Sequence, residues 1–192
     1  MKNIIITLIC YIFIAVSNGQ GGDGEFFKKR YINADNRDTI LVTFFRPLDV
    51  TNTSFYNFRF SRVNSKYFVE IQGTDLQAVK SGDSLWIKFE GGFNITLYAN
   101  ENVKLTREEC ATYPDPSNFS ATYCYSVKFN ISNSQLMAIA GNLVEKMRVF
   151  STIGFTDIKP RDEERQQFLK YANKIKDKQK YKMKSPKEID TW

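Results

Sequence analysis

The feature that most constrains the fold is a run of alternating apolar and polar residues interrupted by two glycines, SLWIKFEGGFNITLYA at 84–99. A two-residue turn at Gly91-Gly92 would put the apolar residues of the two halves on opposite faces of a hairpin. A three-residue loop at 90–92 instead pairs Phe89 with Phe93, Ile87 with Ile95 and Leu85 with Leu97. Because strand register follows the buried face, we predict the three-residue loop, with Gly92 in the left-handed conformation that such loops need.

The other face of this hairpin carries Trp86 and Tyr98. Together the two rings could form a ligand-stacking surface for a sugar or a peptide. The alternative, which we expect, is that the two helical segments nearer the C-terminus cover this face.

The rest of the chain continues the pattern of strands and adds two helices. β-Branched and aromatic runs predict strands at 39–45, 55–63, 66–73 and 122–131, a short strand near 103–105 and a hairpin at 145–158. Apolar residues at helical spacing predict a short helix around 136–143, with Ser132 and Gln135 as its capping box. A second helix is predicted at 161–176, and its first turn is acidic. This order predicts an α+β fold, a mainly antiparallel β-sheet with a short helix and a C-terminal helix packed on it.

The N-terminus has the pattern of a secretory signal peptide. Lys2 precedes an apolar run from Ile4 to Val16, and the small residues Ser17 and Gly19 follow. The run is too short to span a bilayer. We therefore expect export, to the periplasm or the medium, and divide the chain into a signal peptide (1–19), an N-terminal lead-in (20–37), a single α+β domain (38–178) and a basic, frayed tail (179–192).

Signal cleavage would remove Cys10 and leave two cysteines, Cys110 and Cys124, at the ends of CATYPDPSNFSATYC. A zinc site would need two more nitrogen or sulfur donors, and the chain has no histidine. A thioredoxin-like redox site would need the spacing C-x-x-C. In an oxidising compartment, a structural disulfide between Cys110 and Cys124 is the simplest prediction.

The net charge of +6 comes from the two ends of the chain. Residues 170–192 hold eight lysines and three acidic residues, whereas residues 20–169 hold eighteen basic and eighteen acidic side chains. We expect the basic tail, Lys170 to Lys187, to be a solvated end. Contact with a membrane surface of anionic lipids is the alternative, and export together with the absence of a base-stacking motif argues against nucleic acid.

Catalytic motifs are missing from the sequence. Without histidine, the chain cannot form a Ser-His-Asp or Cys-His site, and it contains no phosphate-binding loop or calcium loop. A hydrolase that uses only carboxylates remains open, although no motif places a pair of acids. We predict no catalytic residue, no metal site and no cofactor.

Four N-x-S/T sequons occur, at Asn52, Asn94, Asn118 and Asn130. In a eukaryotic source, Asn118 inside the cysteine loop would be the best acceptor for glycosylation. Asn94 and Asn130 lie in predicted strands and are poorer candidates.

Three segments, LWIKFEGGFNITLYAN, YSVKFNISNSQLMAIAG and VEKMRVFSTIGFTDI, give the chain a resemblance to small exported bacterial proteins of unknown function. The resemblance covers roughly residues 84–176 and rests on structural motifs. It implies export and an α+β architecture, and it implies no activity. The two cysteines and the lysine-rich tail are not part of it.

These observations favour an exported, non-enzymatic module that binds an unknown protein or glycan partner or serves the cell envelope. The runner-up is an exported inhibitor of a hydrolase that presents the disulfide-clasped loop 110–124. The third hypothesis is the carboxylate-only hydrolase.

Overall fold

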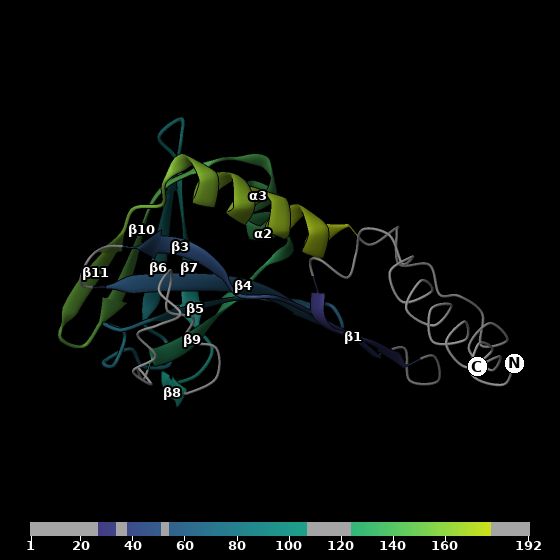
Figure 1. Ribbon diagram of the computed structural model, residues 1–192, viewed down its shortest axis with the longest axis horizontal. Helices are drawn as coiled ribbons and strands as arrows, with labels where there is room; N and C mark the ends of the chain where they lie inside the picture. Colours follow the sequence, from purple (N-terminus) through teal and green to yellow (C-terminus); the bar gives the residue numbers. More distant parts are fainter. Residues whose placement is uncertain (1–26, 34–37, 51–53, 107–123, 178–192) are drawn as a thin grey trace, which may run out of the picture.

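The computed structural model describes residues 27–33, 38–50, 54–106 and 124–177 of the chain (Figure 1). These residues form an eleven-stranded sheet in which neighbouring strands are antiparallel. The strands are β1 (Phe27–Asn33), β2 (Asp38–Thr43), β3 (Arg46–Val50), β4 (Phe55–Val63), β5 (Lys66–Gly73), β6 (Ser84–Phe89), β7 (Asn94–Ala99), β8 (Lys104–Thr106), β9 (Cys124–Ile131), β10 (Val144–Ser151) and β11 (Gly154–Ile158). Two helices accompany them, α2 (Asn133–Gly141) and α3 (Asp162–Lys176). The predicted combination of a mainly antiparallel sheet with helices is confirmed.

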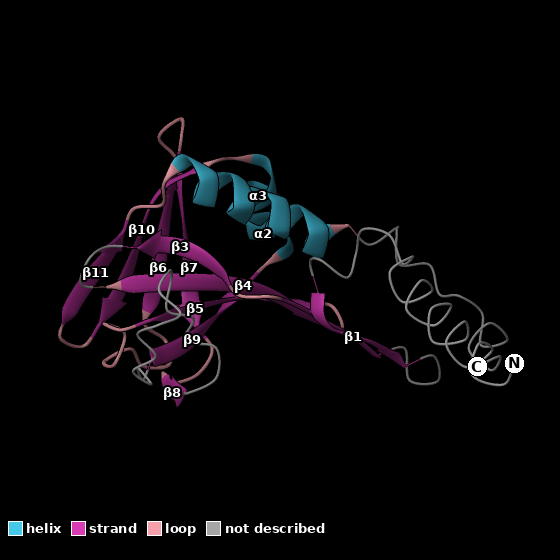
Figure 2. Cartoon of the chain, in the orientation of Figure 1, coloured by secondary structure: helices cyan, strands magenta, loops and turns pink. Residues whose placement is uncertain are grey.

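The strands follow the order β1-β2-β4-β5-β9-β7-β6-β10-β11, with β3 paired to β4 and β8 paired to β9. The sheet curves so that the end of β11 comes close to β3: the backbone N–H of Lys159, just after β11, donates a hydrogen bond of 2.9 Å to Asp49 in β3. Helix α3 lies across this curve and contacts β3, β4 and β10. Figure 2 shows both helices on the same side of the strands.

The face of the sheet that meets the helices is apolar and forms the core. Alternate residues of each strand point into it and are buried, including Phe58 and Phe60 of β4, Val69 and Ile71 of β5, Val127 and Phe129 of β9, and Leu85, Ile87 and Phe89 of β6. Helix α3 adds Phe168, whose ring centroid lies 4.8 Å from that of Phe58 and 4.9 Å from that of Phe60. This aromatic cluster fixes the helix to the sheet.

The glycine hairpin has the predicted register. Leu85 pairs with Leu97 and Ile87 with Ile95, and the rings of Phe89 and Phe93 stack at 4.8 Å. Gly92 has a φ of +90° and Gly91 a φ of +94°, so both positions of the loop need a residue that tolerates the left-handed side of φ. The buried face therefore decides the register, as the sequence indicated.

The predicted capping box of α2 is also present. Ser132 Oγ accepts the backbone N–H of Gln135 at 3.2 Å, and Gln135 Oε1 accepts the backbone N–H of Ser132 at 2.8 Å. Leu136, Ile139 and Ala140 are its buried residues. The helix begins three residues before its first apolar position because the cap starts it.

Two strands were missed by the sequence reasoning. β1 lies inside the segment 20–37 that was expected to be a lead-in, and it extends away from the rest of the sheet, paired only with β2 (Figure 1). Its polar sequence, FKKRYIN, gives no clear alternation. β3 contains Pro47, the residue at which the preceding strand was expected to stop. The proline is tolerated because, among the described strands, β3 pairs only with β4, and the pairing has a register shift between Pro47 and Asp49.

Candidate functional site

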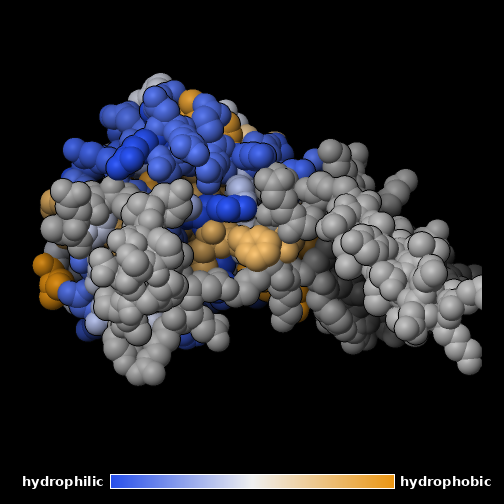
Figure 3. All heavy atoms as spheres, in the orientation of Figure 1, coloured by the Kyte–Doolittle hydropathy of each residue, from blue (hydrophilic) through white to orange (hydrophobic). Residues whose placement is uncertain are grey.

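Helices α2 and α3 pack on the apolar face of the sheet, and we call the opposite face the outer face. It carries the alternate residues that point away from the core, among them Arg59 of β4, Phe68, Glu70 and Gln72 of β5, Ser126, Lys128 and Asn130 of β9, Tyr98 of β7, Trp86 of β6 and Arg148 of β10. Figure 3 shows that the side of α3 turned away from the sheet is hydrophilic. One solvated face is usual for an antiparallel sheet, but here Phe68, Glu70 and Gln72 of β5 are buried on the outer face as well. The exposed aromatic residues and the hollows of this face are therefore the places that point to binding.

Trp86 and Tyr98 both lie on the outer face, as the hairpin register predicts. Tyr98 is 59% exposed and Trp86 is half-buried. Tyr98 stands opposite Ser84 on one side and Asn130 on the other, while Trp86 stands opposite Thr96 and Arg148. Our expectation that the C-terminal helical segments cover these rings is wrong, because α2 and α3 pack on the apolar face.

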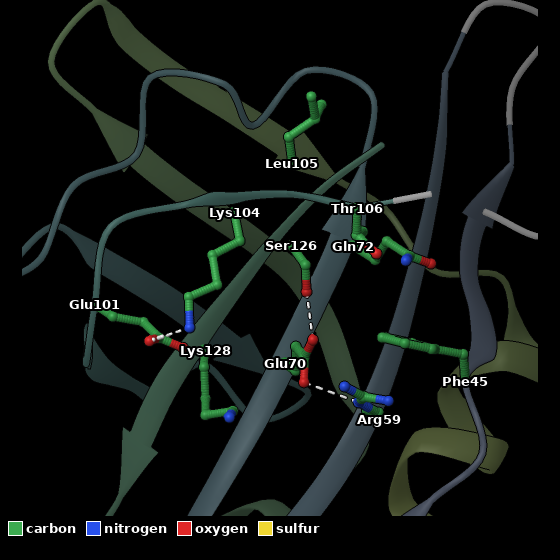
Figure 4. A pocket seen from close by; sticks show the side chains of 10 residues that line it. All are labelled: Phe45, Arg59, Glu70, Gln72, Glu101, Lys104, Leu105, Thr106, Ser126 and Lys128. Carbon is green, nitrogen blue, oxygen red and sulfur yellow. Dashed lines mark hydrogen bonds and ion pairs between the residues drawn. The ribbon is translucent and has the colours of Figure 1, made fainter. Parts of the chain in front are cut away.

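A hollow of about 290 Å³, here called the polar pocket, opens on the outer face (Figure 4). Its floor consists of side chains from three neighbouring strands, β4, β5 and β9. β8 forms one side, and Phe45, from the link between β2 and β3, forms another. The pocket lies where the partner of β9 changes: β7 pairs with the second half of β9, at Phe129 and Asn130, and β8 pairs with its first half, at 124–126.

An ion pair crosses the floor of the polar pocket. Arg59 Nε donates to Glu70 Oε2 at 2.8 Å, and Ser126 Oγ donates to the other Glu70 oxygen. The guanidinium of Arg59 also lies over the ring of Phe45, 4.3 Å from its centroid. The glutamate is 8% exposed. Both of its oxygens are engaged, so Glu70 holds the floor in place.

Two more cations line the pocket. Lys104 pairs with Glu101 at 2.5 Å. Lys128 is half-buried, and its Nζ lies 5.8 Å from the centroid of the Phe68 ring. Within the part of the chain that the structure describes, Lys128 has no ion pair. Figure 4 accordingly draws dashed lines to Arg59 and Lys104 and none to Lys128. Three cations against two carboxylates give the pocket a surplus of one positive charge.

A second hollow, of about 480 Å³, lies where β9 ends and α2 begins, and we call it the Tyr98 hollow. Tyr98, Asn130, Lys66 and Asn133 are among its lining residues. Lys128 and Asn130 are two residues apart on β9, and Phe68 is the register partner of Asn130. The Tyr98 hollow therefore lies near the polar pocket along β9, although the two share no lining residue.

An acidic side chain with two cationic neighbours lies near the far edge of the outer face. Arg148 donates to both oxygens of Asp157, from Nε at 2.7 Å and from Nη2 at 3.0 Å, and Lys146 pairs with Asp157 at 2.7 Å. The hydrogen bonds from Arg148 are the main reason why the pKa of Asp157 falls to about 2, and Lys146 adds to the effect against a smaller opposing contribution from burial. Arg148 also stacks over Phe155, 3.9 Å from its centroid.

The other predicted sites are only partly within the described residues. Cys124 is buried and begins β9, opposite Thr106 at the end of β8. Cys110 and Asn118 lie outside the described residues, so the disulfide and the glycosylation site stay predictions. Asn94 and Asn130 are exposed. Of the Lys170–Lys187 tail, the described part ends with α3 and Asp177.

The polar pocket was not found from the sequence, although a signal for it was present. The strands predicted at 55–63 and 66–73 form a hairpin through a turn at Asn64-Ser65, with Val63 opposite Lys66. Counting back from this turn pairs Arg59 with Glu70, as the structure shows. This charged pair, within two strands that are otherwise rich in aromatic residues, indicates which face of the β4–β5 hairpin is polar. The contributions of β8 and Phe45 depend on tertiary structure and have no local signal.

Among the described residues, no group of three or more acidic or cysteine side chains is arranged to hold a metal ion. None of the helices in those ranges has the length and apolarity needed to cross a membrane. Comparison of the chain with protein-family models, with curated proteins and with solved structures finds no match. The resemblance to small exported proteins therefore remains an interpretation of the sequence.

Proposed function

We propose that this chain is an exported, non-enzymatic binding module that takes a glycan chain across its outer face. The observation that carries the proposal is the position of the helices. Both pack on the apolar face, which leaves Tyr98, 59% exposed, lining one hollow, with the polar pocket near it along β9. A large aromatic ring held exposed on a rigid sheet is a ready stacking surface, because binding costs it little conformational entropy.

The lining of the hollows favours a glycan over a protein partner. Sugars present many hydroxyl groups, each of which needs a donor or an acceptor, and an apolar face on the ring. The accessible polar groups of the hollows include the amides of Asn130 and Asn133 and the ammonium group of Lys128. The core of a protein interface is instead depleted of charged residues.

A binding role also agrees with the state of the acids in the polar pocket. Glu70 and Glu101 are the two carboxylates there. Arg59 and Ser126 occupy both oxygens of Glu70, and Lys104 pairs with Glu101. A glycosidase needs one carboxylic acid that donates a proton and a second free carboxylate. The carboxylate-only hydrolase is therefore the weaker proposal, and a reducing-end assay on a panel of polysaccharides should show no hydrolysis.

A glycan array probed with the mature protein tests the proposal. We expect binding to a set of oligosaccharides, and at least a fivefold loss of affinity in Tyr98→Ala. Met137→Ala is the matched control, because Met137 is 58% exposed on α2, on the helical side. Absence of glycan binding, or an equal loss in the two variants, would contradict the proposal.

The inhibitor hypothesis has one structural observation in its favour. Thr106 and Cys124 are register partners, so segment 107–123 leaves and rejoins the sheet at adjacent positions. Such closely spaced ends suit the presentation of a loop. Deleting residues 111–123 should abolish inhibition of a hydrolase panel if this function holds, whereas the glycan-binding proposal predicts no inhibition by the intact protein.

A further inference from the structure

We infer that the polar pocket recognises a carboxylate-bearing sugar of the bound glycan and that Lys128 is the residue that pairs with this carboxylate. The inference rests on the proposed function and specifies the class of glycan, one that contains acidic sugars such as uronic acids. It is carried by the arrangement of charges in the pocket.

Lys128 differs from the other two cations of the pocket. Arg59 is paired with Glu70, and Lys104 is paired with Glu101. Lys128 lies in the middle of β9, opposite Glu70 of β5. Asn130 lies two residues further along β9, on the same face. No carboxylate of the described ranges pairs with Lys128, and this residue is half-buried. Its ammonium group has the Phe68 ring beside it, and a cation that has given up part of its hydration without a carboxylate partner gains from an incoming anion.

Arg59 supplies a second donor group in the same pocket. Arg59 uses its Nε for Glu70, and among the described residues no other carboxylate pairs with its guanidinium. The ring of Phe68 lies beneath the Lys128 ammonium group, 5.8 Å away. An apolar ring on one side limits water around the ammonium group and strengthens its attraction to an anion. The pocket volume of about 290 Å³ suits one sugar ring.

The position of Lys128 also connects the pocket to the exposed ring. Asn130 follows on the same face of β9, and it stands opposite Tyr98. A glycan chain stacked on Tyr98 would therefore extend over Asn130 and Phe68 toward Lys128. This path assigns neighbouring sugars to the Tyr98 hollow and to the polar pocket, with the acidic sugar in the latter.

The test compares two forms of one ligand, an oligogalacturonate and its carboxyl-reduced form, by isothermal titration calorimetry. We expect the acidic form to bind wild-type protein about tenfold or more tightly than the reduced form, since hydrogen bonds to charged groups are the strong ones. Lys128→Met should remove this preference and leave affinity for the reduced form unchanged. Lys128→Arg should retain it.

Lys88→Met is the control for loss of one positive charge. Lys88 lies on the same face of the sheet, on β6, and pairs with Glu145 at 2.7 Å. This variant should keep the preference. Equal binding of the two ligands, or equal effects of the Lys128 and Lys88 variants, would overturn the inference and leave the proposed function standing.

Two further outcomes are distinguishable. Oligoglutamate that binds as tightly as the oligogalacturonate, with the same dependence on Lys128, would show that the pocket reads a peptide carboxylate and would overturn the sugar assignment. Failure of every oligosaccharide on the array and in the calorimeter would overturn the proposed function itself, and the inference with it. Thermal melting of each variant establishes that it is folded.

Discussion

Replacing Phe168 by alanine tests the packing that leaves the outer face open. Phe168 is fully buried, and its ring contacts those of Phe58 and Phe60 at centroid distances of 4.8 and 4.9 Å. A Phe→Ala change in a core costs about 3–5 kcal/mol, through lost burial and the cavity left behind. Of a total stability of about 5–15 kcal/mol, this is a large share. For a domain of this size it corresponds to a fall in Tm of about 6–20 °C.

Urea and thermal unfolding monitored by circular dichroism measure this loss. Tyr98→Thr is the matched control, because threonine keeps the preference for strands and Tyr98 is 59% exposed. The control should change the free energy of unfolding by less than about 0.5 kcal/mol. A loss below about 1 kcal/mol for Phe168→Ala, or an equal loss for Tyr98→Thr, would refute the assignment of the helices to the apolar face.

Three other changes have defined outcomes. Asp157→Asn should lower the free energy of unfolding by about 1 kcal/mol at neutral pH. Since the pKa of Asp157 is about 2 when folded and about 4 when unfolded, the difference between wild type and variant is present above pH 4 and lost as the pH falls toward 2. A difference in unfolding free energy that stays constant across that range would contradict this prediction. Gly92→Ala should cost about 1–2 kcal/mol, because the φ of +90° strains any side chain, and an unchanged urea midpoint would show that the loop relaxes. Titration of the native mature protein with a thiol reagent should find no reactive thiol if Cys110 and Cys124 are bonded, and two would disprove the disulfide.

The part of the fold that could be predicted is the part with local signals. The hairpin at 84–99 has only one register that buries both apolar sets, and the structure has that register. The capping box at Ser132 and the acidic first turn of α3 likewise mark helix starts by local chemistry. β1 was missed because it is a polar strand that lacks the alternation of apolar and polar residues. β3 was missed because it contains a proline, which usually ends a strand.

The candidate site was less predictable than the fold. The sequence placed Trp86 and Tyr98 on one face, but it did not indicate which face the helices would cover. The face that the helices cover depends on where Phe168 packs. Phe168 packs on the side of the sheet where the apolar residues of β4, β5, β6 and β9 lie together. The polar pocket joins residues from four strands and the link at Phe45. Only the Arg59–Glu70 pair could have been read from the sequence, by counting back from the turn at Asn64.

The account depends most on the claim that the outer face is the binding surface. Two-dimensional NMR of labelled protein, titrated with the tightest oligosaccharide of the array, tests this claim most directly. The account predicts that amide shifts concentrate on β5, β7 and β9, around Phe68, Tyr98, Lys128 and Asn130, and that α3 is unaffected. Shifts confined to α2 and α3, or to residues outside the sheet, would contradict it.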